Sequence, residues 1–520
     1  MSYGVYMMPG PLQRISTMLV FSLCLTVPSC HSDSPPRGPT PRTDLEQLPR
    51  FRGFNLLEKF TVHDDRPYRE EDFRLIAELG FNFVRLPLDY RCFTAARNPR
   101  LLKKNAMREI DAAIGWGERY GIHVCLNFHR APGYCVNPPP EKTDLWEDPR
   151  TQETFAFLWG LFAARYRGIP SEQLSFNLIN EPGEVAETTY TAVMNLAVAA
   201  IRKEDPNRLI VIDGLAWGTR PVSGITDPLV LESARGYAPM PLTHYRAPWV
   251  TGADNFPVPT WPIRCDISAY LYGPDKPDLH SPLEINLPAG RDTTLTILVR
   301  QVSARSRLVV TVDGTTVFEK QFLPGPGKGE WEKVVFAEQW GIYQNIYNTR
   351  YSIPIPAGAQ RITIANVAGD WLLLGNLTVA PLTPAMTEPV VLSPGSPLWG
   401  LTQHPIRITT NGRIESAASG VVLDREWLRR EYLAPWFTAS RQGTMFMVGE
   451  FGAFNQTPHP VVLAWMDDLL RELRKKNIGW ALWNFRGPFG ILDSGRDDVV
   501  YEDFHGHKLD RAMLELLRRN

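Results

Sequence analysis

Two glutamates in this chain are placed for chemistry that needs a pair of carboxyl groups. Glu181 stands in Asn180-Glu181-Pro182 after the apolar run 174–179, and Glu450 ends a second apolar run. Hydrolysis of a glycosidic bond uses such a pair, because one carboxyl protonates the leaving oxygen while the other attacks or stabilises the sugar cation. Neither motif is specific alone, since Asn-Glu-Pro occurs by chance and glutamate at a strand end is common. Their order and context decide the interpretation.

Other polar and aromatic residues stand at the ends of successive predicted strands. They are Arg85, His129, Asn180, Trp217, His244 and Trp483. Each has an ordinary structural explanation, because a lone histidine beside an apolar strand is usually a satisfied core residue and an arginine can form a structural ion pair. One structural explanation for all of them is improbable, since buried polar groups are costly unless they are paired. We expect them to converge on one site with the two glutamates.

Short apolar strands alternate with amphipathic helices from residue 51 onward. The pattern predicts eight strands, at 51–55, 81–87, 122–129, 174–180, 209–213, 240–244, 444–449 and 479–485. It also predicts helices, at 69–79, 106–120, 149–166, 187–204, 424–440, 461–476 and 507–518. Eight such units are the number in a (β/α)8 TIM barrel, an α/β fold whose active sites lie at the carboxyl ends of the strands.

The stretch between the sixth strand and the sixth helix interrupts this rhythm. It contains short alternating strands separated by Asp-Gly, Pro-Gly and Ala-Gly turns, which is typical of a β-sandwich. We predict an inserted all-β sandwich over 263–385, which divides the barrel into 49–262 and 386–520. Such inserts resemble carbohydrate-binding modules, with Trp331, Trp340 and Trp371 as candidate sugar platforms. The alternative is a structural insert that binds nothing.

Composition restricts the partners of the chain. Its 520 residues allow a large core and more than one domain. The formal net charge of −1 argues against nucleic acid or any strongly charged partner. No Cys-x-x-Cys pair occurs, so a structural zinc site is not expected. Cys92 and Cys135 both follow predicted strands, and either a disulfide or two free thiols is consistent with that placement.

The N-terminal residues indicate export. An apolar run over 18–27 follows Arg14 and is too short to span a bilayer as a helix, so residues 1–30 resemble a signal peptide. Val27-Pro-Ser-Cys30 resembles a lipoprotein cleavage box with Cys30 lipidated; an ordinary secretory signal or a start at Met18 are the alternatives. Residues 31–48 read as a disordered linker. We expect an extracellular, periplasmic or envelope-anchored protein.

The barrel motifs together resemble glycoside hydrolase family 5, the cellulase-like family of clan-A retaining (β/α)8 glycosidases. The resemblance covers about 50–260 and 420–520. The motifs are Phe83-Val-Arg-Leu-Pro87, Leu126-Asn-Phe-His129, Leu178-Ile-Asn-Glu-Pro182, His244-Tyr245, Gly449-Glu-Phe-Gly452 and Trp483-Asn-Phe485. Together they are strongly specific, although no single one is.

The resemblance implies a role for each matched residue. Glu181 would be the general acid/base and Glu450 the nucleophile, with Arg85 holding Glu450 ionised. Asn180 would bind the substrate 2-hydroxyl. The remaining substrate-binding residues would be His129, Trp217, His244, Tyr245 and Trp483, with Trp483 as the floor on which a sugar stacks.

One motif departs from the family. The family has His-x-Tyr after the sixth strand, and that tyrosine contacts the nucleophile, whereas this chain reads His244-Tyr245-Arg246. Tyr245 takes the role through a local shift, or Arg246 replaces it, or a tyrosine arrives from elsewhere in the chain.

These observations predict a retaining glycoside hydrolase that cleaves β-glycosidic bonds in a polysaccharide or oligosaccharide, with β-glucan as the leading substrate. A non-catalytic carbohydrate-binding protein on a decayed barrel and a transglycosylase are the alternatives. No cofactor or metal is predicted, because the histidines and carboxyl groups lie on different strands without ligand spacing. We expect a monomer that has no nucleic-acid partner and meets a membrane only through a lipid at Cys30.

Overall fold

The computed structural model describes residues 45–520, apart from 251–252, 254–255, 338–339, 396–398 and 417–420. The predicted signal segment 1–30, with Cys30, and most of the predicted linker lie outside the described residues. The described part begins with the short 3-10 turn Leu45–Gln47. None of the helices in this part has the length and apolar character needed to cross a bilayer.

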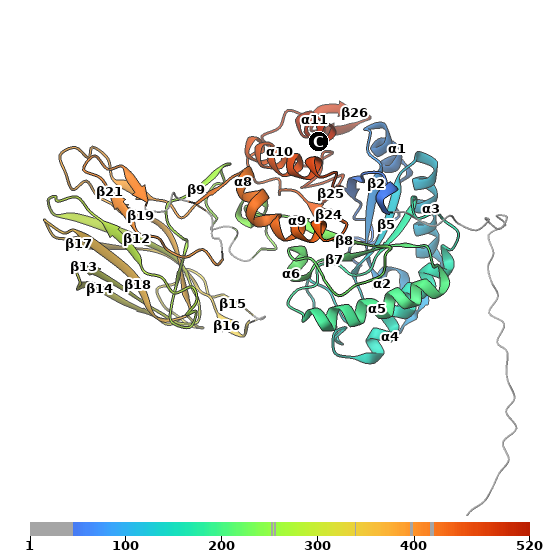
Figure 1. The fold of residues 1–520 in the computed structure, drawn as a ribbon, viewed down its shortest axis with the longest axis horizontal. Coiled ribbons are helices and arrows are strands. Elements are labelled where there is room, and N and C mark those ends of the chain that lie inside the picture. Colours follow the sequence, from blue (N-terminus) through green and yellow to red (C-terminus); the bar gives the residue numbers. More distant parts are fainter. Residues whose placement is uncertain (1–44, 251–252, 254–255, 338–339, 396–398, 417–420) are drawn as a thin grey trace, which may run out of the picture. The chain divides into compact units, whose positions relative to one another are not determined.

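Eight parallel strands close into a barrel, in the order β1-β2-β5-β6-β7-β8-β24-β25. They are β1 (Arg52–Asn55), β2 (Phe83–Asp89), β5 (His123–Arg130), β6 (Leu174–Asn177), β7 (Leu209–Asp213), β8 (Val230–Gly236), β24 (Phe446–Phe451) and β25 (Trp480–Leu482). Helices lie around the outside of the strands (Figure 1). The predicted TIM barrel is confirmed, and its carboxyl-end residues share one rim.

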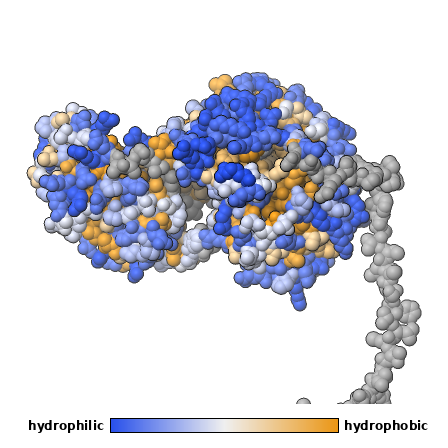
Figure 2. Space-filling view, in the orientation of Figure 1, coloured by the Kyte–Doolittle hydropathy of each residue, from blue (hydrophilic) through white to orange (hydrophobic). Residues whose placement is uncertain are grey.

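The outer helices are amphipathic and turn their apolar faces to the strands. They are α1 (Glu70–Glu78), α3 (Lys104–Tyr120), α4 (Pro149–Arg165), α5 (Glu187–Glu204), α9 (Ala434–Arg441), α10 (His459–Lys475) and α11 (Arg511–Arg519). In α10, the buried Val462, Trp465, Leu469 and Leu473 recur at helical spacing. Hydrophilic residues cover the surface over α10 and α11 (Figure 2).

The prediction of the sixth barrel strand at 240–244 is wrong. The sixth strand is β8, and Pro239 precedes the short helix α7 (Met240–Thr243) instead. The sequence Val-Leu-Glu-Ser-Ala-Arg-Gly of β8 does not form the apolar run that a strand buried on both faces usually shows. Glu232 and Arg235 are tolerated there because the barrel supplies hydrogen-bond partners for both charges.

A two-stranded antiparallel ribbon, which we call the strap, joins the beginning of the insert to its end. β9 (Ile263–Cys265) and β23 (Val421–Leu423) are antiparallel, with Cys265 opposite Val421. Ile263, Cys265 and Leu423 belong to the barrel's apolar core. The chain therefore leaves the barrel and returns to it at one place.

Two mainly antiparallel sheets form the insert itself. One has the order β10-β19-β12-β17 with β20 beside β19, and the other β14-β13-β18-β11-β21-β22. Their strands are β10 (Tyr270–Tyr272), β11 (Leu283–Asn286), β12 (Thr293–Val302), β13 (Ser306–Val312), β14 (Thr315–Phe322), β17 (Ile346–Ile355), β18 (Arg361–Gly369), β19 (Trp371–Val379), β20 (Val390–Leu392), β21 (Ile406–Ile408) and β22 (Ile414–Ser416). The last three strands lie beyond residue 385, the end expected from the sequence.

One apolar cluster joins the two sheets of the insert. Ile297 and Val299 of β12 share it with Val310 of β13 and Ile364 of β18, so the sheets face each other as a sandwich does. This cluster is separate from the barrel core. Among the candidate sugar platforms, Trp371 is buried, Trp331 packs against the cluster and Trp340 is 50% exposed.

Candidate active site

Glu181 and Glu450 both stand at the carboxyl ends of barrel strands. Glu450 is in β24, directly opposite Arg235 of β8, and Glu181 follows the end of β6. Glu181 has a positive φ of 45°. Two contacts hold this conformation: its N–H donates to Asp213 Oδ2 at 2.8 Å, and its carbonyl accepts from the Tyr134 hydroxyl at 2.7 Å. The backbone of Glu181 is therefore fixed from two sides.

One guanidinium contacts both glutamates. Arg235 Nε donates to Glu181 Oε1 at 2.8 Å, and Arg235 Nη2 lies 3.1 Å from Glu450 Oε1. The same Nη2 donates to Asn180 Oδ1 at 2.8 Å and pairs with Asp213. Nε and Nη2 are neighbouring donors on one planar fork. The two glutamates thus meet at one edge of a single side chain.

A second arginine holds Glu450 from the other side. Arg85 Nη1 donates to Glu450 Oε1 at 2.6 Å and to Asn55 Oδ1 at 3.0 Å. Its Nη2 donates to Asn180 Oδ1 at 2.9 Å, and its Nε to Asn177 Oδ1 at 2.8 Å. Arg85 is 1% exposed and Glu450 3% exposed, so this pair lies in a low-dielectric interior. The predicted contact between Arg85 and Glu450 is present.

The charges in this cluster are matched when one carboxyl carries a proton. Arg85 and Arg235 supply two positive charges, and Glu181, Glu450 and Asp213 supply up to three negative ones. Burial, and then the Glu450 charge, raise the pKa of Glu181 to about 7, against the lowering effect of Arg235. Glu181 is accordingly the carboxyl that retains a proton at moderately acidic pH.

Tyr237 is the tyrosine that contacts Glu450. Its hydroxyl donates to Glu450 Oε2 at 3.3 Å, which corresponds to the third of the alternatives left open by the sequence. Burial, and then the Glu450 charge, hold the pKa of Tyr237 well above its usual value, so the hydroxyl keeps its proton and donates. Tyr245 is buried with the Arg246 guanidinium 5.1 Å from its ring centre.

His129, Asn180 and Trp483 lie together beside the two arginines. His129 Nε2 is 3.3 Å from Asn180 Nδ2, and its ring centre lies 5.6 Å from that of Trp483. Burial, followed by the charges of Arg85 and Arg235, holds the pKa of His129 well below its usual value, so the ring is neutral. Its buried Nδ1 has no hydrogen-bond partner among the described residues. A neutral ring with an unused nitrogen suits a hydroxyl-rich ligand.

Trp217 lies in the short segment α6 (Leu215–Gly218) after β7, and His244 directly follows α7. Trp217 has a positive φ of 56°, is 42% exposed, and its N–H donates to the carbonyl of Pro182 at 2.9 Å. A side chain at Gly183 would come within 3.3 Å of the Trp217 indole, which explains the glycine there. The His244 ring packs 5.2 Å from that of Tyr237, and burial lowers the pKa of His244 to about 4.

Sequence reasoning missed several residues of this cluster. Arg235 and Tyr237 were missed because β8 was not recognised as a strand. Asp213 and Asn177 were overlooked, although each is the polar last residue of an apolar strand. Asn177 Nδ2 donates to Asp213 Oδ1 at 3.0 Å, which links the two. The polar last residue of each of these strands was the feature of the sequence that could have identified Asn177 and Asp213 as site residues.

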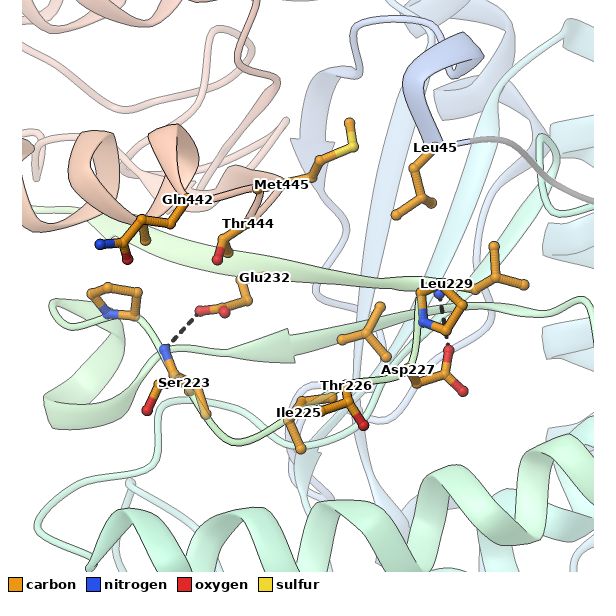
Figure 3. Close-up of a pocket in the computed structure, with 16 residues that line it drawn as sticks. Leu45, Ser223, Ile225, Thr226, Asp227, Leu229, Glu232, Gln442, Thr444 and Met445 are labelled. Atoms are coloured by element: carbon orange, nitrogen blue, oxygen red, sulfur yellow. Dashed lines mark hydrogen bonds between the residues drawn. The ribbon is translucent and has the colours of Figure 1, made fainter.

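A large cavity lies at the other end of the barrel strands. It has a volume of about 900 Å³ and is lined by Glu232 near the start of β8 and by Thr444 and Met445 just before β24 (Figure 3). Burial raises the pKa of Glu232 to about 7, and its carboxylate accepts from the N–H of Val222 at 2.9 Å. No second carboxyl among the lining residues bonds to Glu232, so this cavity does not reproduce the paired arrangement at the other rim.

Cys92 and Cys135 are separate thiols. The Cys92 sulfur lies 3.7 Å from the carbonyl of Lys59, and the Cys135 sulfur 3.7 Å from that of His129. Of the two possibilities left open by the sequence, the structure contains the free thiols.

Known proteins match the barrel part of this chain. A model of the cellulase family, glycosyl hydrolase family 5, matches residues 48–256. Endoglucanase C of Acetivibrio thermocellus is 32% identical over 195 residues, which are 37% of this chain and 56% of that protein. The chain thus spans about 56% of the length of this curated relative.

Solved structures share the fold over most of the chain. One described as a glycoside hydrolase is 27% identical, with a TM-score of 0.56, over 90% of this chain and 99% of that one. Cel5A of Thermotoga maritima in complex with mannotriose is 16% identical, with a TM-score of 0.51, over 90% of this chain and 97% of that one, and shows the common fold. Over residues 48–256, the first part of its barrel, this chain is similar to the cellulase family, glycosyl hydrolase family 5.

Proposed function

We propose that the protein is a retaining glycoside hydrolase that cleaves β-glycosidic bonds, with Glu450 as nucleophile and Glu181 as general acid/base. The observation that supports this most strongly is the contact of one guanidinium with both carboxyl groups. Retaining pairs lie about 5–5.5 Å apart, whereas inverting pairs lie ~6.5–9.5 Å apart to admit a water. Glu181 and Glu450 contact neighbouring N–H groups of Arg235, and this arrangement favours the shorter separation of a retaining pair.

The first step uses the proton of Glu181. The Glu450 carboxylate attacks the anomeric carbon and forms an ester bond to it while the glycosidic C–O bond breaks. The leaving oxygen takes the proton from Glu181. The high pKa of Glu181 supports this role, and the two arginines around Glu450 keep its oxygens oriented for attack.

The second step returns the site to its starting state. Glu181, now ionised, takes a proton from water, and the resulting hydroxide attacks the anomeric carbon. The bond to Glu450 breaks, and Glu450 leaves as a carboxylate. Two inversions at the same carbon give net retention of the β configuration.

We propose β-glucan as the leading substrate. One relative bears the name endoglucanase C, which suggests a glucan, whereas the Thermotoga maritima structure has mannotriose bound. Trp483 and the exposed Trp217 offer indole faces for sugar stacking. We also propose that the insert attaches glycan, through exposed tryptophans such as Trp340 and Trp399, and that the signal-like residues 1–30 direct export.

Substitution of each glutamate by glutamine tests the assignment. We expect Glu181→Gln and Glu450→Gln each to lower hydrolysis of an unactivated β-glucoside by a factor of at least about 10²–10⁴, because general acid and nucleophilic catalysis are lost. Glu232→Gln is the matched control, since it removes another buried glutamate of the same barrel far from the rim. Unchanged activity in either Glu181→Gln or Glu450→Gln contradicts the mechanism. An equal loss of activity in Glu232→Gln contradicts the assignment of catalysis to the pair at the carboxyl-end rim.

Transglycosylation is the second candidate, because it uses the same two carboxyls. Product analysis at high acceptor concentration separates the two activities: transfer products in place of hydrolysis products favour a transglycosylase. A decayed, non-catalytic barrel predicts no activity in the unsubstituted protein.

A further inference from the structure

Arg235 occupies a position that the family resemblance does not explain. The end of β8 reads Arg235-Gly-Tyr237, and Tyr237 makes the nucleophile contact that the His-x-Tyr motif of the family provides. Arginine therefore stands where that motif has histidine. A guanidinium differs from an imidazole because it is always charged and has five donors in a fixed fork.

We propose that Arg235 is a positioning residue that balances whichever of the two catalytic carboxyl groups is ionised, so that one cation serves both halves of the reaction. This inference rests on the proposed function and goes beyond the orientation of Glu450, because it concerns the contact of Arg235 with both carboxyl groups. Its basis is the geometry: the Nε of Arg235 faces Glu181 and its Nη2 faces Glu450, so the side chain need not move between the two states.

Arg235 is fully committed to this cluster. It is 2% exposed, and its third nitrogen, Nη1, donates to Ser233 Oγ at 3.0 Å and to the carbonyl of Ala234. Its backbone is held too, because the Tyr432 hydroxyl donates to the carbonyl of Arg235 at 2.6 Å. A guanidinium anchored at every nitrogen is pre-organised and requires no rearrangement during the reaction.

The charge count is the same before and after the first step. Before it, Glu450 and Asp213 are ionised and Glu181 carries its proton, so two negative charges face Arg85 and Arg235. After it, Glu450 is an ester and Glu181 is ionised, so two negative charges again face the two cations. Arg235 is the cation that contacts the carboxyl losing charge and the carboxyl gaining it. Arg85 contacts only Glu450 of that pair.

The other titratable groups near Glu181 do not supply this balance. Tyr134 contacts only the backbone of Glu181, and Tyr237 contacts Glu450. Tyr432 bonds to the backbone of Arg235, and His129 is neutral. Asp213 adds a further negative charge through the N–H of Glu181. Among the described residues, Arg235 is the cation that forms an ion pair with the Glu181 carboxyl.

Removal of this cation changes the titration of Glu181 in a defined direction. Without Arg235, the ionised form of Glu181 loses its charge-assisted hydrogen bond, so the carboxyl holds its proton to higher pH. An opposite charge within ~4–6 Å changes a carboxyl's titration midpoint by about 1–3 units. The effect is most important in the glycosyl-enzyme, in which Glu181 must be ionised to accept a proton from water.

The experiment titrates Glu181 by ¹³C NMR of carboxyl-labelled glutamate, with the signal assigned by its absence in Glu181→Gln. Glu450→Gln imitates the uncharged, esterified nucleophile. We expect the Glu181 midpoint in Glu450→Gln/Arg235→Gln to lie at least about one unit above that in Glu450→Gln. We expect Glu450→Gln/Arg235→Lys, which keeps the charge, to stay close to Glu450→Gln. Two results would overturn the proposal. In the first, the Glu181 midpoint is the same in Glu450→Gln/Arg235→Gln as in Glu450→Gln. In the second, Arg235→Lys shifts the midpoint as much as Arg235→Gln does.

Arg208 provides the matched control. It is a fully buried arginine at the opposite ends of the strands, where it pairs with Asp205 and donates to the carbonyl of Leu174. Arg208→Lys should lower thermal stability and leave the Glu181 midpoint unchanged. If the Arg235→Gln protein does not fold, Arg235→Met in the same Glu450→Gln background replaces it in the comparison with Arg235→Lys, because methionine is uncharged at every pH.

The titration does not depend on turnover, so it separates two kinds of failure. An inactive parent protein with a normal Arg235 effect contradicts the proposed hydrolase function and leaves the role of Arg235 intact. An active parent protein without the Arg235 effect contradicts only the balancing role.

Discussion

At the scale of single residues, the site is a cluster of fixed opposite charges with one movable proton. Arg85 and Arg235 are both nearly fully buried, and each bonds to Asn180 as well as to Glu450. Buried charges are tolerated only when they are paired and hydrogen-bonded. The cluster satisfies that condition, and the proton on Glu181 brings it to neutrality.

Position relative to the apolar runs decided which members of this cluster the sequence could predict. Glu181, Glu450 and Arg85 each end or follow an apolar run, so strand position revealed them. Arg235 lies inside a strand whose alternation is broken by its own charge and by Glu232. Because Arg235 disrupts the apolar pattern by which strands are recognised, that pattern could not place Arg235 in a strand. Tyr237, which follows the same strand, was missed for the same reason.

The pH dependence of kcat/KM follows from the proton on Glu181. The carboxyl must be protonated for the first step, and its pKa is raised to about 7. As pH rises through that value the proton is lost, so we expect kcat/KM for an unactivated glycoside to fall on the alkaline side with a midpoint near 7.

A substrate with a strongly activated leaving group provides the control for this pH profile. It needs no proton from Glu181 in the first step, so the alkaline fall in its kcat/KM should be absent. The same fall with both substrates would assign the alkaline limb to another group.

At the scale of elements, β8 is held at its end by a segment far away in sequence. Tyr432 lies in the π-helical turn Leu428–Tyr432, between α8 (Arg425–Trp427) and α9. Its hydroxyl donates to the carbonyl of Arg235 at 2.6 Å and accepts from the N–H of Tyr237 at 3.3 Å. The segment that follows the insert therefore fixes the backbone between the two missed site residues.

Tyr432→Phe removes both hydrogen bonds without creating a large cavity. Each leaves a backbone group at β8 unpaired, so we expect a loss of about 1–3 kcal/mol in the free energy of unfolding. Because the same bonds orient Arg235 and Tyr237, kcat/KM should also fall. Chemical unfolding and steady-state kinetics measure the two effects.

Tyr166→Phe is the control for that substitution. The Tyr166 hydroxyl bonds to Asp111 on the outer helices, far from the rim. It should lower stability and leave kcat/KM unchanged. Loss of activity in Tyr166→Phe, or normal activity in a destabilised Tyr432→Phe, would show that Tyr432 only stabilises the fold.

The elements differed in how well the sequence revealed them. Seven of the eight barrel strands lie at or near their predicted positions, because their apolar runs record burial on both faces. The sequence pattern predicts a strand at 240–244, but Pro239 and Pro241 favour the first turn of a helix there. The charges of β8 concealed the true sixth strand.

At the scale of the whole molecule, the apolar core of the insert is distinct from the apolar core of the barrel. The insert's cluster and the barrel's cluster are separate, and the β9–β23 strap belongs to the barrel. Cys265 lies opposite Val421 in that strap, so a two-residue turn can close it as a hairpin. The alternating pattern of short strands predicted the sandwich. The last strands of the sandwich are short and far apart in the sequence, so the predicted boundary fell before them, at residue 385.

Replacement of residues 266–420 by Asn-Gly tests the independence of the barrel. We expect the shortened protein to fold and to hydrolyse a soluble aryl β-glycoside as the full chain does, because the site lies wholly on the barrel. If the insert attaches glycan, binding to insoluble β-glucan should fall. A shortened protein that folds but is inactive would show that the insert contributes to catalysis.

The measurement that tests the central claim most directly is the trapping of the covalent intermediate. A 2-deoxy-2-fluoro-β-glycosyl fluoride with a good leaving group slows the second step and lets the glycosyl-enzyme accumulate. We predict a mass increase of one glycosyl unit, located by peptide mapping on Glu450 and absent from Glu450→Gln. A label on another residue, or hydrolysis that inverts the anomeric configuration, would contradict the account.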